Sequence, residues 1–222
     1  MNAWLCMLAM AVVCRAEIID RIAVTVGDRV ITDSEIMREV RLTAFLNGDP
    51  VDFSPESKRK TADRLVEQRL IQIENDVSMY PPPASEAVDQ MLKQQQERFA
   101  SPAKYQEELR RFGISEQELK AHLQRQLITL RFLELRFRPG IQVTDEEIAA
   151  YFAQRLTPEL KKTHPGVEFS LSDYREQVEQ ALIGERVDKA SDAWLKEARD
   201  HTRIEFRASV FAADQASRGA NK

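Results

Sequence analysis

Along most of the chain, apolar residues recur three or four positions apart, which is the spacing of a helix with one buried face. One such run follows Ser54-Pro55, where a capping hydroxyl precedes a proline at the first helical position. The run ends at Pro81-Pro82-Pro83, because a proline disfavours helical geometry in the residue before it. The buried stripe of this predicted helix consists of Ala62, Leu65, Val66, Leu70, Ile73 and Val77.

The strongest helical pattern begins at Ser115, which forms a predicted capping box with Glu118, and ends at Pro139-Gly140. Two apolar faces run along it, and a helix with two such faces is expected to lie against neighbours on two sides. One face consists of Leu119, Leu123, Leu127, Leu130, Leu133 and Phe137, and the second of Ile128, Phe132 and Leu135.

Caps and helix breakers delimit the other predicted helices. Thr32 and Thr144 each stand three positions before a glutamate, as in a capping box, and Gly113 is placed to end a helix. The polar residues 208–222 are expected to form a flexible tail. The remaining helices are predicted at about residues 33–46, 84–99, 102–112, 145–155 and 173–200.

Strand patterns occur only near the two ends of the predicted domain. Residues 22–30 alternate around Gly27-Asp28, a turn pair typical of a hairpin, and residues 203–207 alternate again. We expect the C-terminal strand to pair with the N-terminal hairpin. The predicted fold is mostly α: a helical module with a small antiparallel β element formed by the hairpin and the C-terminal strand.

The first 16 residues have the pattern of a signal peptide. An apolar run from residue 3 to residue 13 is followed by Arg15 and by Ala16, a small residue suited to the cleavage position. A buried N-terminal helix is the alternative, and lipid attachment at Cys14 is disfavoured because Val13 is not small. Cys6 and Cys14 are the only cysteines, so cleavage after residue 16 would leave no thiol.

Charge and composition disfavour several classes of function. The 222 residues carry a formal charge of −4 without a basic block, which argues against a partner that is a nucleic acid. His122, His164 and His201 are far apart in sequence, and no zinc-binding, nucleotide-binding or nucleophile motif is present. We therefore predict no catalytic residue, no metal site and no cofactor.

The candidates that remain are large apolar side chains on helices whose apolar stripes are thin. Methionine and aromatic side chains suit a surface that binds varied apolar partners. The alternative is that these residues belong to the core, which is the commoner place for such side chains. The client-binding candidates are Met37, Phe45, Met91, Phe99, Tyr105 and Phe112.

The order of these elements resembles that of the SurA-type periplasmic chaperones. The resemblance rests on five segments taken together, none of them specific alone, and covers about residues 17–207. It implies a helical chaperone module completed by its C-terminal helix and strand. The segments are IIDRIAVTVGDRVITDSEI, LVEQRLIQIE, FGISEQELKAHLQRQLITLRF, VTDEEIAAYF and YREQVEQALIGERVDKASDAWLKEARDHTRIEF.

One or two parvulin-type prolyl isomerase domains usually stand between the last two segments in that family. Here only TPELKKTHPGVEF and its immediate flanks separate them, whereas a parvulin domain needs about a hundred residues. The isomerase motifs of the family have no counterpart, so none of its catalytic residues can be assigned. The expected organisation is residues 1–16 signal peptide, 17–156 chaperone domain, 157–171 short linker, 172–207 completing helix and strand, and 208–222 tail.

The resemblance implies an exported, periplasmic chaperone that works without ATP, and the missing isomerase domain leads us to expect that it is not an enzyme. Its expected partners are unfolded or nascent polypeptides, above all outer-membrane protein precursors, with no stable membrane insertion once the signal peptide is removed. Two alternatives stay open: a protein of the prolyl isomerase family with residual activity, and an envelope adaptor that binds one folded partner.

Overall fold

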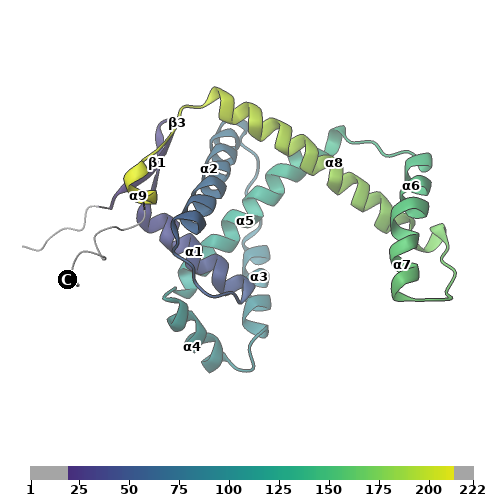
Figure 1. Cartoon of the computed structure of the whole chain (residues 1–222), viewed down its shortest axis with the longest axis horizontal. Coiled ribbons are helices and arrows are strands. Elements are labelled where there is room, and N and C mark those ends of the chain that lie inside the picture. Colours follow the sequence, from purple (N-terminus) through teal and green to yellow (C-terminus); the bar gives the residue numbers. More distant parts are fainter. Residues whose placement is uncertain (1–19, 213–222) are drawn as a thin grey trace, which may run out of the picture.

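The structure is a computed structural model that describes residues 20–212, so the predicted signal peptide and residues 213–222 lie outside the described part. The chain folds into a mostly helical protein with one small antiparallel sheet (Figure 1). None of the helices between residues 20 and 212 is long and apolar enough to cross a membrane. The elements are β1 (Ile22–Val26), β2 (Arg29–Thr32), α1 (Asp33–Asn47), α2 (Pro55–Ser78), α3 (Ser85–Glu97), α4 (Pro102–Phe112), α5 (Glu116–Arg136), α6 (Asp145–Tyr151), α7 (Thr157–Thr163), α8 (Leu171–His201), β3 (Ile204–Phe206) and α9 (Ala208–Phe211).

The two ends of the described chain meet in the sheet, whose strand order is β2-β1-β3. β1 and β2 form the predicted hairpin, and β3 pairs antiparallel with β1 so that Thr25 faces Glu205. Backbone bonds extend this pairing at both ends, from Gly27 N to Arg203 O at 2.9 Å and from Arg207 N to Ala23 O. The predicted closure of the C-terminal strand on the N-terminal hairpin is therefore confirmed.

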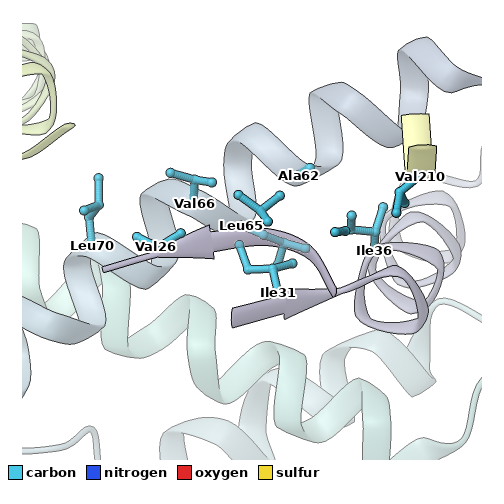
Figure 2. Close-up of a cluster of buried hydrophobic side chains, with 10 residues drawn as sticks. Val26, Ile31, Ile36, Ala62, Leu65, Val66, Leu70 and Val210 are labelled. Atoms are coloured by element: carbon cyan, nitrogen blue, oxygen red, sulfur yellow. The ribbon is translucent and has the colours of Figure 1, made fainter. Parts of the chain in front are cut away.

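The first core lies between the sheet and α2, with α9 at its end (Figure 2). The inward residues of the alternating strands, such as Val24, Val26 and Ile31, are fully buried against the stripe of α2. Val210 of α9 joins the same cluster. Residues 208–212 therefore do not belong to a flexible tail, because burying Val210 and packing Phe211 against this core fixes them.

The helix ends follow the predicted capping chemistry with one informative exception. Ser115 and Thr144 both make complete capping boxes, since each hydroxyl accepts from the third helical N–H and each glutamate reaches back to the capping N–H. The Thr32 hydroxyl caps α1, but the Glu35 side chain does not accept from the Thr32 backbone N–H, as a complete capping box requires. The Glu35 carboxylate instead accepts from Arg69 of α2 at 2.9 Å, so a tertiary ion pair replaces half of the local motif.

A second core joins α1, α4 and the first half of α5, and α3 packs beside it. Leu119 and Leu123 of α5 are buried there. The second half of α5 differs from the prediction of burial on two sides, because Leu130 is 55% exposed and Leu135 is 37% exposed. Among the predicted core residues of that half, Phe132 is the fully buried one.

A separate lobe lies at the far end of α8 (Figure 1). It consists of α6, the π-helical turn Phe152–Leu156, α7 and the first half of α8, around a small core that includes Ile148 and Val178. In the C-terminal half of α8, Trp194 packs on Phe132 with ring centroids 5.1 Å apart and links this helix to α5. The lobe thus has its own core, and α8 extends from it to the rest of the protein.

The segment 157–171, predicted as a short linker, is half helical. The helical run that begins with α6 continues through the π-helical turn into α7, and Pro158 fits because it occupies the first turn of α7. The chain turns at Gly166, whose φ is +83°, before Ser170 caps α8 two residues earlier than predicted. The segment predicted as a short linker is therefore part of the lobe.

Candidate functional site

Five of the six sequence-predicted binding residues gather at one end of the molecule, where α3 turns into α4. Phe45, Tyr105 and Phe112 are buried members of the second core, while Met91 and Phe99 are half-buried at its edge. The sixth, Met37, is half-buried on α1 and belongs to none of the three clusters of buried residues. The structure thus brings together five predicted residues and places three of them in the interior.

The aromatic rings at this end form one contiguous cluster. Phe45 stacks on Phe99 with centroids 5.7 Å apart, and meets Phe112 edge to face at 5.6 Å. Tyr105 lies 5.6 Å from Phe99 and 6.3 Å from Phe45. Such pairs favour these offset and edge-on geometries because of the ring quadrupole. Phe99 is the member that reaches the surface.

A cavity of about 520 Å³ opens on one side of Phe99, and we call it the tip cavity. Phe45, Phe99 and Phe112 supply its aromatic lining. Its rim carries cationic side chains from the end of α3 and from both ends of α4. The charged residues that line the tip cavity are Arg98, Lys104, Glu108 and Arg111.

A second cavity of about 400 Å³ lies on the other side of Phe99. The phenol of Tyr105 lines it and lies beside Gln96 and Glu116, which are joined by a hydrogen bond of 3.1 Å. Burial, aided by the nearby Glu116 carboxylate, raises the pKa of Tyr105 to about 12. The phenol therefore stays protonated at any physiological pH.

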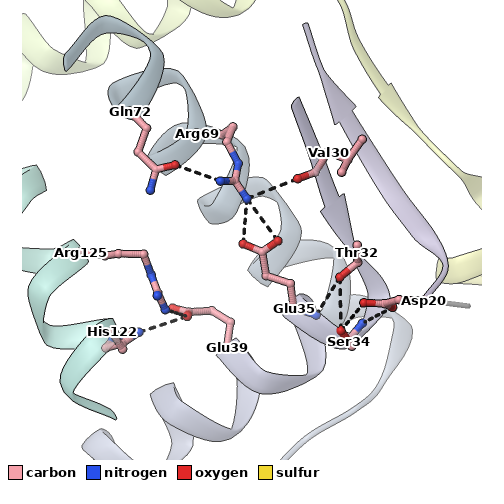
Figure 3. A network of polar contacts seen from close by, with 10 residues as sticks. All are labelled: Asp20, Val30, Thr32, Ser34, Glu35, Glu39, Arg69, Gln72, His122 and Arg125. Carbon is pink, nitrogen blue, oxygen red and sulfur yellow. Dashed lines mark hydrogen bonds and ion pairs between the residues drawn. The ribbon is translucent and has the colours of Figure 1, made fainter. Parts of the chain in front are cut away.

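A buried, hydrogen-bonded pair of polar side chains lies away from this tip, between α1 and α5 (Figure 3). Glu39 is 5% exposed and His122 is 3% exposed, and His122 Nδ1 lies 3.1 Å from the Glu39 carboxylate. Burial works to raise the pKa of Glu39, but the hydrogen bond and charge of His122, with the charges of Arg125 and Arg64, hold it below its usual value. An ionised carboxylate only accepts, so Nδ1 carries the proton.

Sequence reasoning did not find this pair. In the sequence His122 is one of three widely separated histidines, and its partner lies 83 positions away on another helix. The same face of α1 carries the Glu35–Arg69 pair, and Asp20 accepts from Ser34 nearby (Figure 3). These contacts tie α1 to α2, to α5 and to Asp20, two positions before β1, which is a structural role.

The other two histidines have local partners. His164 Nδ1 lies 2.9 Å from the Thr163 hydroxyl, and its ring meets Phe169 edge to face. His201 Nδ1 donates to the Glu197 carbonyl of its own helix at 2.8 Å. Within residues 20–212, no three side chains of His, Cys, Asp or Glu gather in a way that could hold a metal ion.

Apolar side chains are also exposed where α2 ends. Val77 is 75% exposed and Met79 is 83% exposed, and Met79 has a φ of +50°, an uncommon value for a residue with a side chain. The chain then returns to α5, where Tyr80 meets Phe132 edge to face and the Pro81 carbonyl accepts from Arg131. Together with Phe99 and Leu130, Val77 and Met79 give the protein apolar surface on more than one helix.

The chain matches no family model, and no curated protein matches it with significance.

Proposed function

We propose that the protein is an ATP-independent chaperone of the periplasm that binds unfolded polypeptides, above all precursors of outer-membrane proteins. The observation that carries this proposal is the ordered set of five segments that resembles the SurA-type chaperones. In that family the C-terminal helix and strand complete the N-terminal module. The pairing of β3 with β1 is the arrangement that this resemblance leads one to expect.

The surface of the molecule gives separate support. An unfolded client presents apolar side chains in many sequences, so its receptor needs accessible apolar groups that adapt their shape. Phe99 beside the tip cavity and the exposed Val77 and Met79 are groups of this kind. Binding the unfolded form keeps its apolar segments from aggregating and requires no chemical step.

The decisive experiment is an aggregation assay. An outer-membrane β-barrel protein is diluted from urea into buffer with or without the chain that begins at residue 17, and light scattering is recorded without ATP. We expect scattering to be suppressed at near-stoichiometric ratios. Scattering that is unchanged for several unrelated clients would overturn the proposal.

Matched substitutions locate the binding surface. Phe99→Glu places a charge beside the tip cavity and is expected to weaken suppression. Val167→Glu is the control, because Val167 is 49% exposed in the turn that precedes α8, in the separate lobe. Equal loss in both variants would argue against the tip as the client site.

Two further measurements test the alternatives. Catalysis of proline isomerisation in a short peptide, well above the uncatalysed rate, would favour the isomerase alternative. Pull-down of a single stoichiometric folded partner, together with a negative aggregation assay, would favour the adaptor alternative.

A further inference from the structure

The charge of the tip cavity is opposite to that of the whole chain. The protein carries a formal charge of −4, whereas the cavity is lined by three cations and one carboxylate, a formal charge of +2. The cations are Arg98, Lys104 and Arg111, and the carboxylate is Glu108. The side chains that line the apolar cavity therefore carry a net positive formal charge.

Among the three cations, Arg98 is the one without an ion pair to a carboxylate of the described residues. Its guanidinium donates to the Leu46 carbonyl at 2.8 Å and to the Gln95 side chain. The same bond to Leu46 anchors the guanidinium at the cavity. Arg98 thus presents an anchored positive charge next to Phe99.

The other two cations have partners that a ligand could replace. Lys104 pairs with Glu107 at 2.7 Å, and Arg111 pairs with Glu108 at 3.1 Å, with both cationic side chains 65% exposed. Exposed pairs of this kind contribute little stability. Lys104 also stands in the first turn of α4, where the helix dipole favours an anion instead.

From these contacts we infer that the tip cavity binds a peptide segment in which a large apolar side chain is flanked by carboxylates. The apolar group would lie on the aromatic lining, while the carboxylates would meet Arg98 and the two exchangeable cations. This inference rests on the proposed function and adds a selection among unfolded segments: acidic flanks are favoured and basic flanks are rejected.

Two fluorescein-labelled nonapeptides test this selection by anisotropy. Both have the centre Leu-Phe-Leu, one with two aspartates on each side and the other with two lysines. We expect the acidic peptide to bind about ten-fold more tightly at low ionic strength, with a ratio that shrinks as salt is added. Equal affinity, tighter binding of the lysine peptide, or no binding of either peptide would overturn the inference.

Charge reversals assign the selection to the cavity. Arg98→Glu is expected to abolish or invert the preference, but it also removes the bond to the Leu46 carbonyl. Arg111→Glu is the second variant, because it removes no bond to the backbone, only the ion pair with Glu108 and the contact of the guanidinium with the Phe112 ring, and it should reduce the ratio by about three-fold. Lys161→Glu, in the last turn of α7, is the control and should leave the ratio unchanged. An equal effect of the control would refute the assignment.

The two proposals fail in distinguishable ways. If aggregation is suppressed but the peptides bind equally, the chaperone function stands and the charge selection is wrong. If the acidic peptide binds selectively but aggregation of no client is suppressed, the cavity stands as a peptide site and the chaperone function is wrong.

Discussion

The buried Glu39–His122 pair allows a direct test of what holds α1 against α5. We choose His122→Leu as the perturbation, because leucine has a volume close to that of histidine and leaves no large cavity. The substitution removes the donor that lies 3.1 Å from the Glu39 carboxylate and leaves that carboxylate 5% exposed. Arg125, at 3.8 Å and with its side chain 35% exposed, remains as a partial partner.

The magnitude follows from the cost of an uncompensated buried charge. Removing the partner of a buried carboxylate, so that its charge is left uncompensated, typically costs about 3–5 kcal/mol. Because Arg125 keeps part of the attraction, we expect the lower end, a loss of about 3 kcal/mol in the free energy of unfolding at pH 7. Replacing both partners, with Glu39→Met added, should recover most of this loss, since no charge is then buried.

The pH dependence has a definite sign. In the wild type the folded pKa of Glu39 lies below its usual value of 4.5, so its contribution is complete above about pH 4.5 and is lost as pH falls through the folded pKa. In His122→Leu the main interaction that counteracts the effect of burial is removed, so the pKa of Glu39 rises. Each unit by which it exceeds the unfolded pKa removes about 1.4 kcal/mol of the penalty on acidification. The destabilisation should therefore be smaller at pH 4.5 than at pH 7.

Urea denaturation of the wild type, both single variants and the double variant at the two pH values measures these quantities. His201→Ala is the control, because its imidazole is exposed and bonds only within its own helix. A loss below 1 kcal/mol for His122→Leu, or a loss that does not change between the two pH values, would refute the reasoning.

Two other predictions concern the sheet and the aromatic tip. Phe206→Ala should lower the free energy of unfolding by about 2 kcal/mol. The half-buried ring packs on the first core, and its centroid lies 3.6 Å from the Arg59 guanidinium. A loss below 0.5 kcal/mol in urea denaturation would contradict this prediction. The pKa of Tyr105 is raised to about 12, so this phenol should not ionise between pH 9 and pH 11. Tyr105→Phe should therefore leave the rise in absorbance at 295 nm over this range, which reports tyrosine ionisation, unchanged. A smaller rise in the variant would show that this phenol ionises earlier. The raised pKa favours the neutral phenol in the folded state, so its contribution to stability is complete below the unfolded value of 10 and is lost as pH rises from there through the folded pKa of about 12.

The candidate site was only partly predictable. The aromatic residues at the tip could be chosen from the sequence, because large apolar groups on thinly apolar helices are conspicuous. Their burial could not, since Phe45 belongs to α1 and Phe112 to α4, and each covers the other only after these helices pack. The basic rim of the tip cavity likewise unites residues from the end of α3 and both ends of α4.

What the sequence by itself determined is local. The caps at Ser115 and Thr144, the hairpin at Gly27-Asp28 and the stripe of α2 depend on residues within a few positions of one another, so their patterns can be read directly. The closure by β3 was also predictable, because two short isolated strands need partners for their backbone groups.

Only the tertiary structure decided the rest. Glu35 leaves its capping box for Arg69 on α2, and Glu39 meets His122 across 83 positions of sequence. The separate lobe, and the exposure of Leu130 on α5, depend on where α8 extends beyond the main core. Each of these features depends on residues of a distant helix, so it contributes to stability only once the helices have packed.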